Sequence, residues 1–183
     1  MNKQQLAAKI WESANQMRSK IEANEYKDYI LGFMFYKYLS DQTVAFAEKQ
    51  GLTGEDLKQL NEEDQETVDY FKSNMGYFIA YDNLFSTWIE QGKDFEVANV
   101  RDSLSAFNRL INAKHKKLFS GIFTTLETGL SKLGDTAAKQ TKAISELIHL
   151  IQDIPTDGKQ SYDVLGFIYE YRGRSEFCVS LSC

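Results

Sequence analysis

The residue types that usually carry out chemistry are few and scattered in this chain. Its two histidines, His115 and His149, are isolated and fit no metal-ligand spacing such as HExxH, and a lone histidine is more often structural than catalytic. The glycines match neither GxGxxG nor GxxxxGKS/T, and the carboxylates fall on polar faces and in loops, where solvated residues belong. We therefore predict no catalytic residue, no cofactor-binding residue and no metal ligand in this chain by itself.

One segment could bind an anion. The residues KHKK at 114–117 form the only basic cluster in the sequence, and clustered lysines are what contacts to DNA phosphates require. The alternative is that these charges satisfy the macrodipole at the C-terminal end of a helix predicted over residues 97–111. In order of preference, the residues predicted to contact DNA are Lys114, Lys116, Lys117, Arg18 and Arg101.

The aromatic stretch from residue 69 to residue 88 is a second place where a nucleic acid could bind. Aromatic side chains can stack on a base extruded from DNA, at about 1 to 3 kcal/mol per base. The stretch has almost no interleaved Lys or Arg, however, so packing in a hydrophobic core is favoured over base stacking. The aromatic residues concerned are Tyr70, Phe71, Tyr77, Phe78, Tyr81, Phe85 and Trp88.

Charge and composition limit the classes of protein that fit this sequence. The formal net charge of -5 argues against a free-standing nucleic-acid binder, although it allows a local basic face. A length of 183 residues indicates one domain, and the single proline, Pro155, favours long uninterrupted helices. The N-terminus lacks the apolar core of a signal peptide, so we expect a cytoplasmic protein. Cys178 and Cys183 lie too close to the C-terminal end for a disulfide between them to stabilise the fold.

The element that must position the rest is the stretch YKDYILGFMFYKYLSD at residues 26–41. A helix that is apolar on two faces, as this one is, must be surrounded by other protein segments, because its apolar run is far shorter than the roughly 20 residues of a membrane span. Gly32 would let a neighbouring helix approach closely, at about 1 kcal/mol of helix propensity relative to Ala. The two faces consist of Ile30, Phe33, Met34 and Tyr38, and of Leu31, Phe35 and Leu39.

Other helices are predicted around this hub. The first should pack against the hub as a hairpin, and the acidic stretch at 48–66 predicts a surface loop with one short helix. We find no run of alternating strand residues and no internal repeat. The predicted fold is therefore all-α, a compact multi-helix bundle with a buried central helix near residues 27–48. Apolar stripes at helical spacing cover residues 6–21, 97–111, 144–151 and 162–171.

Polar residues before these stripes predict where some of the helices begin. Residues of the Ser, Thr, Asp and Asn types cap helix N-termini by accepting hydrogen bonds from free backbone N–H groups. The predicted caps are Thr53 with Asp56, Asn99 with Asp102, and Asp135.

Three of these segments resemble one protein family. Trp11 with Arg18, the stretch 26–41, and YDVLGFIYEY at 162–171 occur in an order and separation similar to the modification subunit of type I restriction-modification enzymes, the HsdM family. The resemblance covers roughly residues 4–171. It implies a helical N-terminal domain before a Rossmann-like S-adenosylmethionine domain, in a subunit that methylates the exocyclic amino group of adenine. It also implies DNA as a ligand of the assembled complex, and three partners: a specificity subunit, a second modification subunit and a restriction subunit.

The C-terminal end departs from the family pattern. In the family, the helix resembling residues 162–171 leads to a cofactor loop and later to a motif with two adjacent prolines that holds the target amino group, whereas this chain has one proline. The segment RGRSEFCVSLSC at 172–183 continues neither that pattern nor the apolar stripe. We therefore expect residues 1–171 to be the helical N-terminal domain, residues 172–183 to be a non-native or frameshifted tail, and the S-adenosylmethionine-binding catalytic domain to be absent.

Two functions are compatible with these observations. The first is the N-terminal helical domain of an adenine-specific DNA methyltransferase subunit, which helps to clamp DNA and to assemble the other subunits. The alternative is a self-contained helical protein-protein interaction module with no catalytic parent. The native gene distinguishes them, because a downstream frame with a glycine-rich cofactor loop supports the first and a genuine stop codon supports the second.

Overall fold

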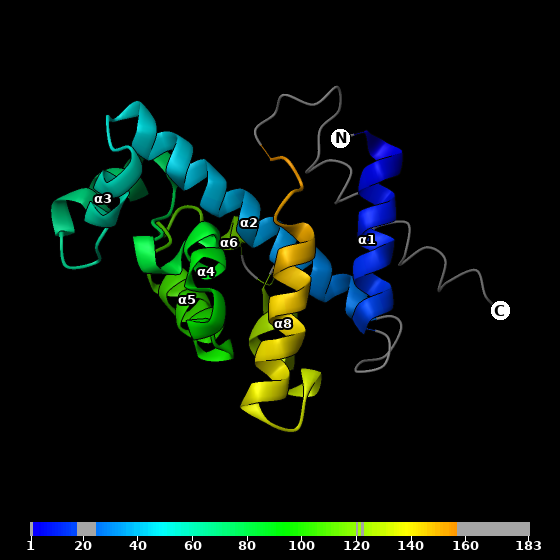
Figure 1. Cartoon of the computed structure of the whole chain (residues 1–183). Helices are drawn as coiled ribbons and strands as arrows, with labels where there is room; N and C mark the ends of the chain where they lie inside the picture. Colours follow the sequence, from blue (N-terminus) through cyan, green and yellow to red (C-terminus); the bar gives the residue numbers. More distant parts are fainter. Residues whose placement is uncertain (1, 18–24, 120, 122, 157–183) are drawn as a thin grey trace.

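Helix α2 (Tyr26–Lys49) is the longest element of the described chain and the centre of its fold (Figure 1). All residues of α2 from 29 to 37 are buried. Because apolar side chains point to two faces of this helix, neighbours on one side alone could not bury them. The predicted buried hub is confirmed. The computed structural model describes residues 2–17, 25–119, 121 and 123–156.

Helices from both halves of the chain contact α2. They are α1 (Lys3–Met17), α4 (Phe85–Gln91), α7 (Thr124–Gly129) and α8 (Ala137–Ile151). In Figure 1, α8 crosses α2, and α1 lies beside α8. The predicted packing of the first helix on the hub is confirmed, although α1 packs against α8 as well.

Gly32 marks the point where α7 comes closest to α2. A Cβ added at Gly32 would lie 2.9 Å from Cγ of Leu126 on α7. Nearly one turn earlier, the hydroxyl of Tyr29 donates a hydrogen bond to the carbonyl of Gly129, also on α7, at 2.6 Å. The predicted close approach at Gly32 is confirmed, and α7 is the helix that makes it.

The rest of the described chain is helical in shorter pieces. Its one strand-like contact is an isolated antiparallel bridge between Tyr77 and Ile111. The residues that the structure describes contain no strand, so the predicted all-α class is confirmed. The remaining elements, with η for a 3-10 helix, are η1 (Gly54–Gln59), α3 (Gln65–Met75), η2 (Tyr81–Asn83), η3 (Gly92–Asp94), α5 (Val97–Arg109), α6 (Lys116–Phe119) and η4 (Leu130–Leu133).

Aromatic side chains fill the main core around α2. Tyr36 stacks on Trp88 with ring centroids 4.7 Å apart, and Phe107 approaches Tyr36 edge-on. Two residues of the aromatic stretch are not buried: Tyr81 is half-buried against the core, and Tyr70 is 47% exposed and donates a hydrogen bond from its hydroxyl to the side chain of Gln50. Core packing is thus confirmed for the buried members, which are Phe71, Tyr77, Phe78, Phe85 and Trp88.

A second, smaller core lies at the C-terminal end of α2. It holds α3 and η1 there, far from α1 in Figure 1. The predicted short helix of the acidic stretch is η1, and none of its residues is buried. The buried residues of this core are Ala47, Leu60, Val68, Phe71, Phe78 and Ala80.

The helix starts differ in detail from the predicted caps. Thr53 precedes η1 as predicted, but its side chain makes no capping hydrogen bond. A capping box of Glu96 and Asn99 starts α5, so Asn99 lies inside the helix rather than at its cap. Thr136 caps α8, one residue after the predicted Asp135. In α5 and α8 the cap is the residue whose backbone is extended just before the first helical turn.

Several predicted features lie outside the described residues. These are the end of the first apolar stripe beyond Met17, the helix predicted at 162–171 and the tail at 172–183. Within the described ranges, no helix combines the length and apolar character needed to cross a membrane.

Candidate nucleic-acid interface

The basic cluster lies between α5 and α6, in a segment that we call the lysine turn (residues 112–117). Lys114, Lys116 and Lys117 are exposed, and no residue in the described part of the chain forms an ion pair with them. Because α5 ends at Arg109, the three lysines lie beyond its last turn, and it is within that turn that a charge interacts most strongly with the helix macrodipole. Lys116 and Lys117 belong to α6, a single turn whose few aligned peptide groups give little reason for two lysines.

Asn112 fastens the lysine turn to the C-terminal end of α3. Its side-chain oxygen accepts a hydrogen bond from the backbone N–H of Lys114 at 3.0 Å, and its side-chain nitrogen donates to the carbonyl of Lys72 at 3.2 Å. Its backbone N–H donates to the carbonyl of Gly76 at 2.8 Å, and its carbonyl accepts from the N–H of His115 at 2.9 Å. These hydrogen bonds fix the backbone of the lysine turn relative to α3.

Gly76 follows α3 and supplies the surface against which the ring of His115 lies. Its φ of +90° is in the left-handed region, which favours glycine. A Cβ added at Gly76 would lie 2.9 Å from Cγ of His115. Nδ1 of His115 is buried and has no hydrogen-bond partner among the described residues. Packing against Gly76 therefore orients the ring, without help from a hydrogen bond at Nδ1.

The acidic stretch lies at the opposite end of α3. Glu62, Glu63 and Asp64 precede this helix, and Asp64 caps it by accepting a hydrogen bond from the backbone N–H of Thr67. The 11 residues of α3 separate its ends by about 16 Å, roughly twice the screening length of about 8 Å at physiological ionic strength. These carboxylates therefore do little to reduce the positive potential at the lysine turn.

The other residues predicted to contact DNA do not join the lysine turn. Arg101 is exposed on α5, but its guanidinium donates a hydrogen bond to the side chain of Gln140 at 2.9 Å, which ties it to α8. Arg18 lies outside the described residues. The structure thus brings together the three predicted lysines and places Arg101 at a different contact.

A polar cavity of about 560 Å³ lies among η1, η2 and α5. The charges that line it do not favour a phosphate group. Glu63, Asp82 and Asp102 line it without forming an ion pair with any described residue, whereas its cations, Lys58 and Arg109, are paired with neighbouring carboxylates. The free charges of the cavity are therefore negative. Among the residues that the structure describes, no group of His, Cys, Asp and Glu is placed to hold a metal ion.

Comparison with known proteins decides the family. A family model for the HsdM N-terminal domain matches residues 6–151. The chain belongs to the HsdM N-terminal domain family. The predicted resemblance is therefore confirmed, and the matched range includes both the hub helix and the lysine turn.

Two longer proteins resemble this HsdM N-terminal domain. The type I restriction enzyme MpnII methylase subunit of Mycoplasma pneumoniae is 28% identical over an alignment 179 positions long, and the match covers 89% of this chain and 33% of the relative. The crystal structure of a type I restriction-modification system methyltransferase subunit from Streptococcus thermophilus matches with a TM-score of 0.75 and 29% identity, over 96% of this chain and 39% of that one. The chain thus spans between a third and two fifths of the length of these relatives.

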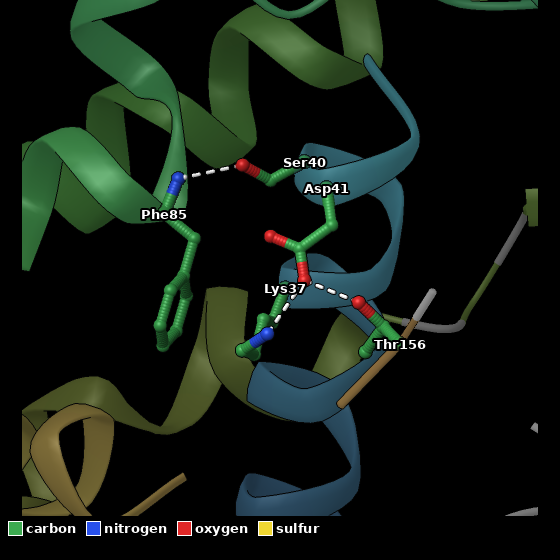
Figure 2. Close-up of polar contacts among 5 residues, drawn as sticks. All are labelled: Lys37, Ser40, Asp41, Phe85 and Thr156. Atoms are coloured by element: carbon green, nitrogen blue, oxygen red, sulfur yellow. Dashed lines mark hydrogen bonds and ion pairs between the residues drawn. The ribbon is translucent and has the colours of Figure 1, made fainter. Parts of the chain in front are cut away.

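The hub of this HsdM N-terminal domain carries a buried polar group that the sequence did not reveal (Figure 2). The ammonium of Lys37 lies 2.5 Å from the carboxylate of Asp41, and the hydroxyl of Thr156 donates a hydrogen bond to the same carboxylate oxygen. Nζ of Lys37 also lies 5.9 Å from the ring centroid of Phe85. Beside them, Ser40 accepts a hydrogen bond from the backbone N–H of Phe85 at 2.8 Å.

This polar group joins three elements, and the side chain of Asp41 is its only partly exposed charged member. It connects α2 to the start of α4 and to the segment that follows α8 (Figure 2). Lys37 is 7% exposed and Thr156 is 9% exposed, so the charge of Lys37 is buried and interacts within the fold. The spacing of Lys37 and Asp41 is a signal that the sequence contains, but Thr156 lies 115 residues from Asp41 and no local pattern points to it.

Proposed function

We propose that this chain is the helical N-terminal domain of the modification subunit of a type I restriction-modification enzyme. The observation that carries the proposal is the family match over residues 6–151, and the fold shared with the Streptococcus methyltransferase subunit supports it. The whole subunit is then an adenine-specific DNA methyltransferase. Because both relatives are much longer than this chain, methyl transfer belongs to a region beyond the matched residues.

The reaction of the whole subunit needs parts that this domain is not predicted to supply. A base inside a duplex must be extruded before its amino group can react, and S-adenosylmethionine, the proposed methyl donor, needs its own pocket. The contribution of this domain is therefore to hold DNA and to assemble the complex. Its proposed partners are the specificity subunit, a second modification subunit and the restriction subunit.

The lysine turn is the proposed DNA contact of this domain. Its three ammonium groups are exposed, have no counter-charge among the described residues and extend from a backbone that Asn112 fixes. Lysines bind phosphate oxygens as point charges and do not read base edges, so such a contact positions DNA without selecting its sequence. This fits a complex in which another subunit recognises the sequence.

Salt dependence of DNA binding tests the role of the lysine turn. The variant K114A/K116A/K117A is prepared in the full-length subunit, assembled with its partners and titrated with a short mixed-sequence duplex at several salt concentrations. Each phosphate contact contributes about 0.9 to the slope of log affinity against log salt, so loss of three contacts lowers the slope by about 2.7. An unchanged slope would exclude these lysines.

A matched variant controls for the loss of positive charge. Lys49, Lys93 and Lys142 are exposed lysines on three other elements, so K49A/K93A/K142A removes the same net charge without touching the lysine turn. We expect this variant to bind the duplex with nearly the wild-type slope. Equal losses in both variants would mean that total charge matters and that the lysine turn does not.

The native gene tests the proposed domain boundary. Residues 157–183 lie outside the described part of the chain, so the expected end of the native sequence at Tyr171 stays a prediction. Sequencing the native gene beyond the codon for Tyr171 should reveal a continuing frame with a cofactor loop. An in-frame RGRSEFCVSLSC followed by a natural stop would contradict the proposal.

A further inference from the structure

We propose that Gly76, Asn112 and His115 are positioning residues, which hold the lysine turn in the shape that meets the DNA backbone. The inference rests on the proposed function, because it assumes that the lysines bind phosphates. It adds that the fixed backbone beneath the lysines, as well as their charge, determines how many of them bind at once.

The first step of the argument is the role of Asn112. Its side-chain oxygen binds the N–H of Lys114, inside the lysine turn, and its side-chain nitrogen binds the carbonyl of Lys72, in the last turn of α3. One side chain thus connects the segment that carries the charges to a helix that the smaller core holds on α2. The carbonyl of Lys72 also accepts the backbone N–H of Gly76 at 3.1 Å, so Asn112 and Gly76 both bind the same oxygen at the end of α3.

The second step is the contact between Gly76 and His115. The left-handed backbone at Gly76 turns the chain so that its carbonyl accepts the N–H of Asn112, and the missing side chain leaves room for the ring of His115. His115 lies between Lys114 and Lys116, so a displacement of its ring would shift the backbone from which both lysines extend. A methyl group at Gly76 would displace that ring.

The third step is the unpaired Nδ1 of His115. Buried polar atoms in folded proteins nearly always have a hydrogen-bond partner, and this one has none among the described residues. A sequence selected for stability alone would favour an apolar side chain at this position. Functional sites are where proteins break the rule that buried polar atoms have partners. The unpartnered Nδ1 of His115, beside three exposed lysines, fits such a site.

A backbone fixed before binding explains why the positions matter. Phosphates along one DNA strand are regularly spaced, and a flexible turn would have to be ordered each time it meets them. The lysine turn is ordered already by the bonds of Asn112 and by the contact at Gly76. Loosening it should therefore reduce the number of simultaneous phosphate contacts while all three lysines are still present.

The substitution Gly76→Ala tests this inference, with Gly51→Ala as its matched control. Gly51 has nearly the same φ, +88°, but an added Cβ there meets nothing within 4 Å. Both variants therefore place an alanine at a positive φ, and only Gly76→Ala pushes on His115. Each is made in the full-length subunit, assembled with its partners and titrated with the same mixed-sequence duplex, in the wild-type and K114A/K116A/K117A backgrounds.

We expect Gly76→Ala to lower the salt slope by at least about 0.9, the value of one phosphate contact, and Gly51→Ala to leave it unchanged. In the background without the three lysines, Gly76→Ala should have no further effect, because it acts through them. Asn112→Ala should behave like Gly76→Ala, which provides a second measurement if one variant folds poorly.

The possible failures can be told apart. If K114A/K116A/K117A lowers the slope but Gly76→Ala and Asn112→Ala do not, the positioning inference is wrong and the proposed DNA contact stands. If Gly76→Ala lowers the slope equally without the lysines, it acts through general destabilisation and the inference is also wrong. If the triple lysine variant itself has no effect, the proposed DNA contact fails first and the inference fails with it.

Discussion

The hub helix and the lysine turn use the same residue types for opposite purposes. Lys37 is buried in α2, where its ammonium contacts the carboxylate of Asp41. The lysines at 114, 116 and 117 face solvent without a counter-charge among the described residues. The charge of Lys37 is neutralised inside the fold, whereas the other three are left for a binding partner. Position in the structure, and not residue type, therefore decides which lysine has a function beyond stability.

The two regions also differ in how they use glycine. A Cβ at Gly32 would lie 2.9 Å from Leu126, and a Cβ at Gly76 would lie 2.9 Å from His115. Gly32 is helical, so it contributes only the space that α7 occupies, whereas Gly76 also contributes a left-handed backbone. The hub thus depends on close packing, and the lysine turn depends on the direction of its backbone.

The substitution Asp41→Asn, which changes the hub and leaves the lysine turn intact, should have the largest effect on stability. It leaves the ammonium of Lys37 buried without a counter-charge, and breaking a buried ion pair in this way costs about 3 to 5 kcal/mol. Because the side chain of Asp41 is 33% exposed, water offsets part of this loss, and we expect the free energy of unfolding to fall by about 2 kcal/mol. Urea unfolding followed by circular dichroism measures the change.

A double variant provides the control for Asp41→Asn. Replacing the pair by apolar residues, as in K37M/D41L, removes both charges and should recover most of the lost stability. A protein with Asp41→Asn that unfolds at the wild-type urea concentration would show that Lys37 needs no counter-charge.

The substitution Gly32→Ala should have the next largest effect. It gains about 1 kcal/mol of helix propensity but overpacks the contact with Leu126, which costs about 1 to 3 kcal/mol. We expect a net loss of about 1 kcal/mol in the free energy of unfolding. In a background with Leu126→Ala the clash is absent, so the same substitution should be neutral or stabilising. A stabilised Gly32→Ala protein with Leu126 intact would contradict the close approach of α7.

The buried tyrosine side chains of the hub make the folded protein less stable at alkaline pH. Burial raises the pKa of Tyr29 from 10.0 to about 12, because the folded protein favours the neutral phenol. The stability that the neutral Tyr29 contributes to the fold is fully present below pH 10 and is lost as the pH rises from 10 to about 12. Burial also raises the pKa values of Tyr36 and Tyr77, so they act in the same direction.

Thermal unfolding of Tyr29→Phe checks this loss of stability at alkaline pH. The variant loses the hydrogen bond to the carbonyl of Gly129, at about 1 kcal/mol near neutral pH. Its Tm should then fall less steeply than that of the wild type as the pH rises above 10. Parallel curves for the two proteins would contradict the contribution of Tyr29.

Removing the lysines of the turn should affect stability least. Exposed substitutions away from special features usually change the free energy of unfolding by less than about 0.5 kcal/mol. We expect K114A/K116A/K117A to unfold with nearly the wild-type urea midpoint while the salt slope of its DNA binding falls. A large loss of stability in this variant would mean that these lysines, like Lys37, belong to the fold.

The hub and the aromatic core could be predicted because their signals are local. A helix that is apolar on two faces must be buried wherever its neighbours lie, and α2 shows this along residues 29–37. The aromatic stretch lacked the interleaved cations of a nucleic-acid surface, and Trp88 is accordingly buried against Tyr36. Helix caps were harder to predict, since Glu96 and Thr136 cap their helices through backbone conformation and not through residue type alone.

The setting of the lysines could not be predicted because it depends on distant segments. The sequence identified the cluster at 114–117, but it could not show that α5 ends at Arg109 or that Asn112 reaches the end of α3. The contact of Gly76 with His115 spans 39 positions and has no periodic signature. For the same reason the bond between Asp41 and Thr156 became visible only in the folded chain.

The bond between Thr156 and Asp41 affects how the end of α8 is held. Thr156 follows α8 and is the last described residue, and its hydrogen bond to Asp41 fastens it to α2. The C-terminal end of the described chain is therefore anchored on the hub helix by a polar bond as well as by the packing of α8.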